Sequence, residues 1–235
     1  GNTGATLIAA HSVFGMMPGV DRPALATTIP TRHRDAVLLD VGATIDCRPR
    51  HLLQFAAMGT VYAERVLGIE RPRVGLLSIG EEAIKGNELT RDAHHLLSNS
   101  DIRFIGNLEA RDLYSGDADV VVCDGFTGNV ALKVSEGLVE VVEDLLRDEL
   151  NRTFTTQLGY LLSRRSYRRF RRRVDYSEYG GAPLLGVAGL AVVGHGRSSV
   201  KAVRNALALT HRFVNEDFVQ SIDESMSSLS SERSH

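Results

Sequence analysis

The sequence predicts a three-layer α/β/α domain built on a parallel sheet. Short apolar runs rich in valine and isoleucine alternate with longer segments whose apolar residues recur at helical spacing. The short runs are continuously apolar, as expected of parallel strands that helices cover on both faces. Most of them end at glycine, which commonly marks the turn from a strand into a helix. We therefore expect parallel strands joined by right-handed helical crossovers.

Five strands and four helices account for this alternation. In chain order, apolar runs predict strands over 37–41, 73–79, 102–105, 120–123 and 189–193. The segments between and after them have helical spacing and predict helices over 51–67, 88–97, about 129–150 and 198–218. Glycines set the ends: the first four strands stop before Gly42, Gly80, Gly106 and the pair Asp124-Gly125, and the first helix stops near Gly68.

Two segments depart from the alternation. Residues 153–174 place apolar side chains between arginines at helical spacing, which predicts a basic amphipathic helix or helical hairpin inserted at about 151–175. From residue 221 the chain carries seven serines in fifteen residues, so we expect a disordered tail over 221–235. Residues 1–220 are then expected to form a single α/β domain.

The charge is distributed unevenly along the chain. The formal net charge is only −2, but residues 164–173 contain seven arginines and no acid. Without them, 20 basic residues face 29 acidic ones. A basic patch on an acidic body predicts a local anionic partner, such as a membrane surface or an acidic protein.

The remaining composition excludes several classes of protein. No apolar run approaches the length of about 20 residues that a membrane-spanning helix needs. The two cysteines, Cys47 and Cys123, are far apart and form no CxxC pair, so we expect buried thiols in a reducing cytoplasm and neither a disulfide nor a zinc framework. The sequence also lacks a P-loop, a complete GxGxxG after a strand, a GxSxG elbow and an evident acidic metal cluster. We therefore expect no metal and no cofactor, and any acyl chemistry would proceed by direct attack of a bound nucleophile.

Four glycine-rich loops are the candidate binding elements. They are 1–5, 80–88, 124–129 and 194–199, and each precedes an expected helix. We expect them to gather at the carboxyl ends of the strands, where free N–H groups and helix dipoles suit a phosphate. The candidate phosphate ligands in these loops are Asn2, Thr3, Gly4, Asp124, Thr127, Asn129 and Ser198. The alternative is that these residues are ordinary turn and cap residues, and for Asp124 in particular that it caps the following turn.

Three further residues are the candidate catalytic groups. Lys85 stands in a glycine-flanked loop and could stabilise negative charge, and His195 lies between two glycines and could polarise a carbonyl or hold phosphate. Asn87 would orient one of them. The alternatives are a solvated loop lysine and a capping histidine.

Seven ordered motifs together resemble one known family. They are GNTGA at 1–5, LLDVGATIDC at 38–47, GLLSIGEEAIKGNEL at 75–89, FIGNLEARDL at 104–113, VVVCDGFTGNVALK at 120–133, DYSEYGGAPLLGVAGL at 175–190 and GHGRSS at 194–199. The chain is similar to the bacterial phosphate acyltransferases of phospholipid synthesis, the PlsX family. That resemblance implies a Rossmann-like sandwich, like that of phosphotransacetylases and of isocitrate and isopropylmalate dehydrogenases. It also implies transfer of a fatty acyl group from acyl carrier protein to inorganic phosphate by a cytoplasmic homodimer that is loosely attached to the membrane.

The resemblance carries one departure and leaves alternatives open. Members of the family have more chain before the GNTGA motif, so we expect the N-terminal part to be missing here. The other functions considered are phosphotransacetylase-like transfer from acyl-CoA, a decarboxylating dehydrogenase, and a non-catalytic membrane- or carrier-binding module. For the basic segment, the expected contact residues are Leu158, Leu161, Arg168, Arg169, Phe170 and Arg172. They would meet anionic lipid or the acidic carrier protein, or would instead pack on the partner of the homodimer.

Overall fold

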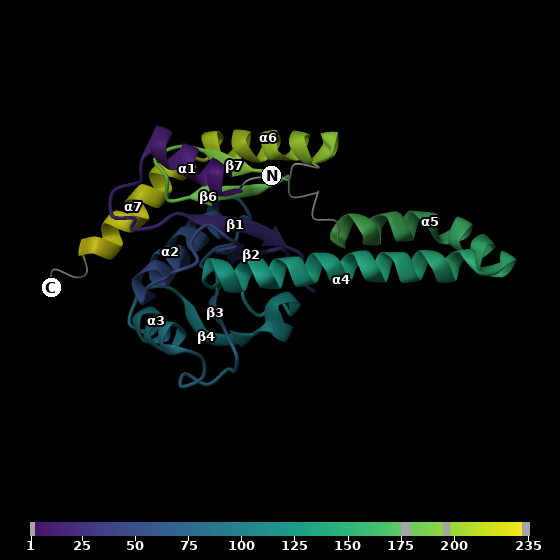
Figure 1. Cartoon of the computed structure of the whole chain (residues 1–235), viewed down its shortest axis with the longest axis horizontal. Helices are drawn as coiled ribbons and strands as arrows, with labels where there is room; N and C mark the ends of the chain where they lie inside the picture. Colours follow the sequence, from purple (N-terminus) through teal and green to yellow (C-terminus); the bar gives the residue numbers. More distant parts are fainter. Residues whose placement is uncertain (1–2, 175–179, 195–197, 232–235) are drawn as a thin grey trace.

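The computed structural model describes residues 3–174, 180–194 and 198–231, arranged as a central sheet with helices on both faces (Figure 1). The strands are β1 (Ala24–Ile29), β2 (Ala36–Leu39), β3 (Val74–Ser78), β4 (Phe104–Glu109), β5 (Val120–Val122), β6 (Ala182–Leu185) and β7 (Ala191–Val193). The α-helices are α1 (Thr3–Phe14), α2 (Pro49–Arg65), α3 (Glu88–Ser98), α4 (Gly125–Asn151), α5 (Phe154–Val174), α6 (Val200–Asn215) and α7 (Phe218–Ser231), and a 3₁₀ turn η1 spans Ala110–Tyr114. The predicted three-layer α/β architecture is confirmed.

The seven strands form one mixed sheet in the order β4-β3-β5-β2-β1-β6-β7. The four strands β4, β3, β5 and β2 are parallel to one another, as the sequence predicts. The prediction of a wholly parallel sheet is wrong for the other side, because β1 is antiparallel to both of its neighbours and β7 is antiparallel to β6. Consequently β1 and β7 run opposite to β2.

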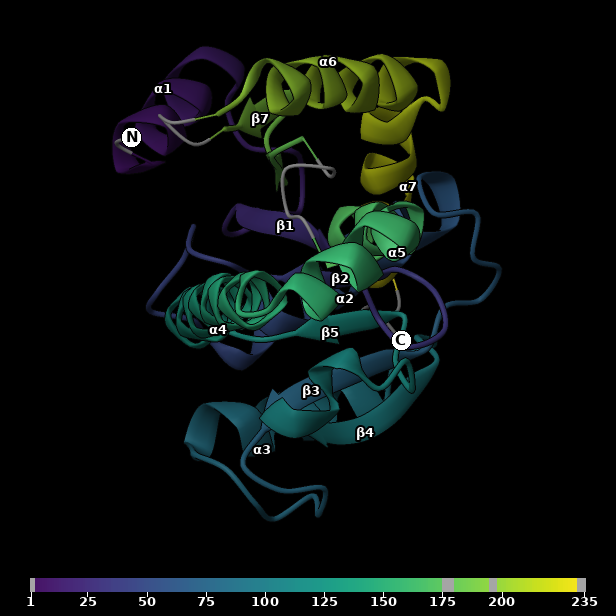
Figure 2. The same ribbon diagram turned by 90° about the vertical axis from the view of Figure 1, so that its right-hand side faces the viewer.

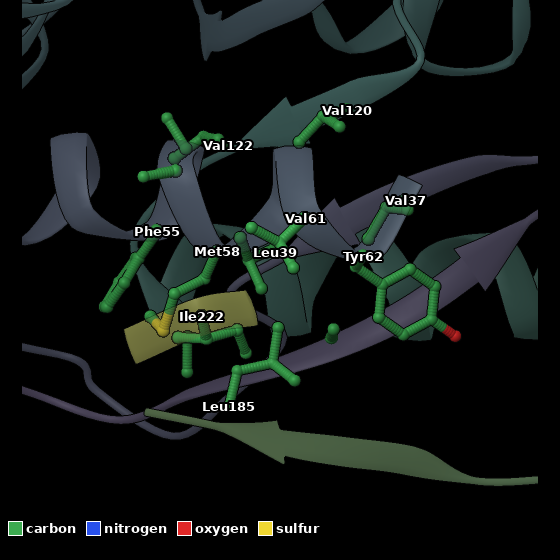
Figure 3. Close-up of a cluster of buried hydrophobic side chains, with 14 of the residues drawn as sticks. Val37, Leu39, Phe55, Met58, Val61, Tyr62, Val120, Val122, Leu185 and Ile222 are labelled. Atoms are coloured by element: carbon green, nitrogen blue, oxygen red, sulfur yellow. The ribbon is translucent and has the colours of Figure 1, made fainter. Parts of the chain in front are cut away.

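Alternate residues of the central strands pack into two separate apolar layers. Val37 and Leu39 of β2 face the layer formed with α2 and α7, whereas Leu38 faces the opposite layer. The same two-residue period divides β5, where Val120 and Val122 point one way and Val121 the other. Figure 3 shows the first layer, in which side chains of α2 and α7 meet those of the sheet. Burial on both faces is why these runs are continuously apolar in the sequence.

The prediction of a disordered tail is wrong as far as Ser231. Residues 218–231 form α7, which contacts α2, and its apolar residues Phe218, Ile222 and Met226 are at most 2% exposed. The rings of Phe218 and Phe213 stack with centroids 4.4 Å apart. These residues recur every four positions and define a helix face. The serines between them obscure that face in the composition.

Helices α4 and α5 form a hairpin that extends well beyond the sheet (Figure 1). Figure 2 views the hairpin from its tip, with α4 and α5 in front of the layered body. The basic insertion predicted at about 151–175 is therefore the second helix of this hairpin. Within the described residues, neither these helices nor the others have the length and hydropathy that crossing a bilayer requires.

Local sequence patterns misplaced or missed several elements. β1 and β6 were not expected, because each contains proline or threonine and lacks a valine-rich run. β4 begins and ends later than the expected strand, and α4 begins four residues earlier than expected because Asp124 caps it. α6 ends at Asn215, before a turn in which Asp217 has a positive φ of 46°.

The carboxylate of Asp119 links three segments at the amino ends of the parallel strands β2, β3 and β5. Its carboxylate accepts hydrogen bonds from the Arg73 backbone N–H at 2.8 Å and from the guanidinium groups of Arg73 and Arg34 at 3.0 Å. Asp119 is 1% exposed. Burial opposes ionisation, but the hydrogen bonds from Arg73 and Arg34 hold the pKa of Asp119 below its ordinary value. The ion cluster therefore joins the starts of β3 and β5 to the segment that leads into β2.

We expect Asp119→Asn to lower the free energy of unfolding by about 2–3 kcal/mol at pH 7, because a buried ion cluster loses its negative charge. The loss is limited because the Arg34 side chain is half exposed and can be hydrated. The matched control is Asp144→Asn, whose 2.7 Å pair with Arg147 is exposed and should contribute about 1 kcal/mol or less. Denaturant titrations of the full-length protein measure both.

The same substitution has an expected pH dependence. The folded pKa of Asp119 is depressed, so its contribution is present above the unfolded value of about 4 and is lost as pH falls through the folded pKa. The difference between wild type and Asp119→Asn should therefore shrink below about pH 4. A difference that stays constant down to pH 3 would show that the charge of Asp119 does not contribute to stability.

Candidate functional site

The carboxyl ends of β2, β5 and β3 form one edge of the sheet, and the candidate site lies along this edge. The three strands are parallel neighbours, so the segments that follow them are adjacent in space. These segments are the loop 40–48 after β2, the start of α4 after β5, and the loop 79–87 after β3. Two of the four predicted glycine-rich loops, 80–88 and 124–129, thus lie at this edge.

The loop after β2 is held by a buried aspartate. Asp40 is fully buried, and its carboxylate accepts backbone N–H groups from Leu25, Gly42, Ala43 and Thr44 at 2.7–3.2 Å. Burial raises the pKa of Asp40, and the four N–H donors, which favour the charged form, oppose that rise. Asp40 thereby fixes the loop against β1.

The first turn of α4 packs directly on this loop. The Gly125 N–H donates to the Thr44 carbonyl at 2.9 Å, and a Cβ at Gly125 would lie 2.7 Å from the same oxygen. A Cβ at Gly128 would collide with the Asp40 carbonyl oxygen. Glycine at these two positions therefore permits a backbone approach that a side chain would prevent.

Asp124 is the N-cap of α4, which matches the structural alternative considered for it. Its carboxylate accepts the Thr127 N–H at 2.9 Å and the Thr127 hydroxyl at 2.7 Å. The Gly128 N–H donates to the Asp124 carbonyl at 3.0 Å. The first-turn N–H groups of Thr127 and Gly128 are thus bonded to acceptors of Asp124. The Asp124 carboxylate therefore occupies the position at the helix N-terminus that the sequence predicts for a phosphate. Asn129 is exposed and lies next to Gly42.

Lys85 lies on an exposed turn that follows β3. Its backbone N–H donates to the Glu82 carbonyl at 3.0 Å, and the Asn107 side-chain amide of β4 donates to the same carbonyl at 2.9 Å. Gly86 has a φ of +100°, which favours glycine at the exit from this turn. Asn107 is 5% exposed and its Oδ1 has no hydrogen-bond partner among the described residues. A buried amide thus anchors the turn that presents Lys85.

Asn87 caps a helix. Its side-chain oxygen accepts the Thr90 N–H at 2.9 Å, which makes it the N-cap of α3. Because its side-chain oxygen is used in this cap, Asn87 could orient a catalytic group such as Lys85 only indirectly, by positioning α3 and the turn before it. Lys85 and Asn129 are both exposed along this edge, where Glu81, Glu82 and Phe126 are exposed as well.

The other predicted ligands do not gather at this edge. Thr3 and Gly4 open α1, which contacts β7 at the far side of the sheet from β3. Ser198 follows β7, and because β7 runs opposite to β2, its carboxyl end faces the other edge. The expectation that all four loops share one edge is wrong for the loop after β7, because strand direction depends on pairing that local sequence does not reveal. Asn2 and His195 lie outside the described residues.

The chemistry available at this edge is that of charge and hydrogen bonding. Burial raises the pKa of Cys47 to about 12 and also raises the pKa of Cys123 well above its ordinary value, so both thiols stay protonated near neutral pH. Cys123 is buried and Cys47 is partly buried. The described residues contain no group of three or more histidine, cysteine or acidic side chains that could hold a metal ion.

Sequence reasoning missed the residues that support the site. They are Asp40, Thr44 and Asn107. The available signal for Asp40 is an acidic residue directly after a buried strand and two residues before Gly42. Asn107 gives no such signal, because its partner Glu82 is 25 residues away.

We expect Gly128→Ala to destabilise the protein by about 2–3 kcal/mol, because the added methyl group meets the Asp40 backbone and forces the loop and α4 apart. The matched control is Gly137→Ala in the same helix, where no atom lies within 4 Å of the added Cβ. That change should stabilise the helix by up to about 1 kcal/mol. Thermal unfolding of both variants tests the contrast, and equal effects would contradict the close approach.

Comparison with known proteins identifies the family. The chain is 53% identical over 216 residues to a protein of Syntrophotalea carbinolica called phosphate acyltransferase, covering 92% of this chain and 62% of that protein. It is 52% identical to one of the same name from Acidobacterium capsulatum, covering 95% of this chain and 66% of that protein. The chain thus spans slightly less than two thirds of the length of these relatives.

Solved structures support the same fold at low sequence identity. A phosphotransacetylase from Streptococcus pyogenes has a TM-score of 0.58 at 16% identity, covering 95% of this chain and 61% of that one. A branched-chain phosphotransacylase from Enterococcus faecalis has a TM-score of 0.51 at 16% identity, covering 85% and 65% of the two chains. At this identity the likeness concerns the fold alone. Residues 1–221 match the family of fatty acid synthesis proteins, and the chain belongs to that family.

Proposed function

We propose that this chain is part of a transferase that moves a fatty acyl group from the thioester of acyl carrier protein to inorganic phosphate, giving an acyl phosphate for phospholipid synthesis. The observation that carries the proposal is the identity of 50–53% with three proteins called phosphate acyltransferase, over 92–96% of the chain. The residues at the carboxyl edge of the sheet are compatible with it, because they offer a cation and amide donors.

The proposed reaction needs positioning and charge stabilisation. A phosphate oxygen attacks the thioester carbonyl carbon, and the carbonyl electrons move onto oxygen. When they return, the carbon–sulfur bond breaks, and the thiolate that leaves takes up a proton. Holding phosphate beside the thioester supplies several kcal/mol, on the order of the advantage of an intramolecular reaction. Each donor directed at the developing oxyanion adds about 3–4 kcal/mol.

We assign two exposed side chains of this edge to these tasks. Lys85 stabilises the developing negative charge, and Asn129 with Thr127 holds phosphate. Because the Thr127 hydroxyl donates to Asp124, it reaches phosphate only if that capping bond opens. Lys85 and Asn129 are therefore the stronger assignments. Asn2, Thr3, Gly4, Ser198 and His195 stay predictions of the sequence.

We expect Lys85→Ala in the full-length enzyme to lower the turnover number at least about 100-fold, because a charged stabiliser of the transition state is lost. The control is Lys133→Ala, which removes a lysine of α4 whose ammonium pairs with Glu136 at 2.6 Å. Acyl phosphate formation from acyl carrier protein and phosphate is the measurement. Near-normal turnover of a folded Lys85→Ala enzyme would remove Lys85 from the mechanism.

Phosphotransacetylase-like transfer from acyl-CoA is the second candidate, because two solved phosphotransacylase-type enzymes share the fold. The same assay with acetyl-CoA and with long-chain acyl-CoA in place of acyl carrier protein separates the two. A higher kcat/KM with acetyl-CoA would replace the proposed donor.

The hairpin is proposed as the contact surface for the carrier protein and for anionic membrane. Its exposed residues in α5 include Leu158, Leu161, Arg168, Phe170 and Arg172. Arginine beside apolar side chains suits both a lipid interface and an acidic protein. Arg169 is exposed on the same helix. A homodimer in which part of this hairpin packs on the partner is proposed with it.

We expect Arg168→Glu/Arg172→Glu to raise the KM for acyl carrier protein at least about 10-fold at low salt and to reduce co-sedimentation with phosphatidylglycerol vesicles, because each arginine near an anionic surface contributes about 1 kcal/mol. Both effects should shrink as salt is added. The control is Arg65→Glu/Arg204→Glu, which reverses two exposed arginines outside the hairpin. If neither quantity changes relative to that control, the hairpin is not an anion-contact surface.

A further inference from the structure

An arginine-rich recess opens beside the start of α2, on the same edge of the sheet as the candidate site. Its volume is about 640 Å³. It is lined by Asp21, Arg22, Asp46, Cys47, Arg48, Arg50 and His51. The loop 40–48 contributes three of these residues and also supplies the Thr44 carbonyl that binds Gly125 of α4. The recess and the start of α4 are therefore supported by one loop.

The side chains around the start of α2 are positively charged, which is unfavourable at a helix N-terminus. Arg48 is the N-cap, Arg50 lies in the first turn, and that turn contains no acidic residue. A helix N-terminus carries partial positive charge, so arginines there raise the electrostatic energy of this helix end. By contrast, α3 and α4 begin at Asn87 and Asp124, whose side chains accept N–H groups. Of the three helices that start at this edge, α2 is the one built to attract an anion.

His51 contributes a donor to the recess. It is 6% exposed, and its Nδ1 accepts the Arg48 backbone N–H at 3.1 Å. Burial, together with Arg22, Arg48 and Arg50, lowers the pKa of His51 despite the opposing influence of Asp21. The neutral ring with Nδ1 as acceptor carries its proton on Nε2. A buried imidazole that lines the recess thus offers an N–H whose partner is not supplied by the described residues.

The two acids leave a positive balance in the recess. Asp21 pairs with Arg50 at 3.1 Å, so this pair is locally neutral. The other charged groups of the lining are then Arg22, Arg48 and the single carboxylate of Asp46. Two guanidinium groups and one imidazole N–H in a recess of this size match the oxygens of a phosphate group.

We propose that this recess binds a phosphate group, held by Arg22, Arg48 and the Nε2–H of His51. The inference deepens the proposed function and rests on it for the two sources of that phosphate. One is a free inorganic phosphate, bound in addition to the acceptor assigned to Asn129, and the other is the phosphoryl group on the pantetheine arm of the acyl donor. In either case the phosphate sits beside the loop that supports α4.

Calorimetric titration of the full-length protein with inorganic phosphate and, separately, with phosphopantetheine tests the proposal. Arg22→Gln/Arg48→Gln should weaken binding of at least one of these ligands about 10-fold or more. The matched control is Arg65→Gln, which removes an arginine from the opposite end of the same helix and should change neither affinity. The ligand whose affinity falls identifies the source of the phosphate.

Two further measurements keep the outcome independent of folding and of the proposed reaction. Arg48→Asp supplies a favourable N-cap, so the ligand-free protein should keep or raise its Tm while phosphate-group affinity falls. A lower Tm with unchanged affinity would assign Arg48 a structural role and overturn the proposal.

Repeating the titrations in Lys85→Ala separates the recess from the catalytic edge. Binding that is lost in Arg22→Gln/Arg48→Gln but retained in Lys85→Ala supports the recess even if the transferase proposal fails. Unchanged affinity for both ligands in Arg22→Gln/Arg48→Gln rejects it.

Discussion

Four backbone N–H groups converge on the buried carboxylate of Asp40, and the geometry of the candidate edge depends on them. They come from β1 and from the loop after β2, two segments that the Val41 N–H also joins by donating to the Leu25 carbonyl at 3.0 Å. Without an acceptor at this place, several buried N–H groups would be left unpaired, at about 1–3 kcal/mol each. Because Asp40 holds the loop, the Thr44 carbonyl can receive Gly125 and the Asp40 backbone can lie against Gly128. The placement of α4, and with it of Asn129, follows from this contact.

The helices that begin at the edge differ in what they leave available. Asn87 and Asp124 engage the first donors of α3 and α4, so these helix ends offer less to an anion than their glycine-rich sequences suggest. The start of α2 has arginines where the others have acceptors. In the proposed site, charge recognition at this edge depends on side chains, which are Lys85 and Asn129 after β3 and β5 and the arginines of the recess beside β2.

The hairpin is constructed differently from the sandwich. Its two helices contact each other along their length and project from the body (Figure 1). An apolar stripe with helical spacing is exposed on α4 in this single chain, formed by Phe126, Val130, Val134, Leu138, Val141, Val142 and Leu145. Arg171 of α5 pairs with Glu143 of α4 at 3.3 Å, and Arg173 reaches the carbonyls of Thr31 and Arg32. These contacts fix the root of the hairpin, while most of its surface is open to other molecules.

The sequence by itself determined the α/β class, the parallel half of the sheet and the family, because buried strands such as β2 and β5 are continuously apolar and end at glycine or Asp-Gly. It also located Lys85 on the loop after β3, and it placed Asn129 after β5, where the structure has it near the start of α4. Tertiary structure alone decided the direction of β1 and β7, which moved Ser198 away from the edge, because strand pairing joins segments far apart in the chain. It likewise decided the roles of Asp40 and Asn107, whose partners are distant in sequence, and the order of the serine-rich segment, which Phe218, Ile222 and Met226 anchor by burial against α2. The periodicity of apolar residues predicts which face of a helix or strand is buried, but only tertiary packing determines which other element covers that face.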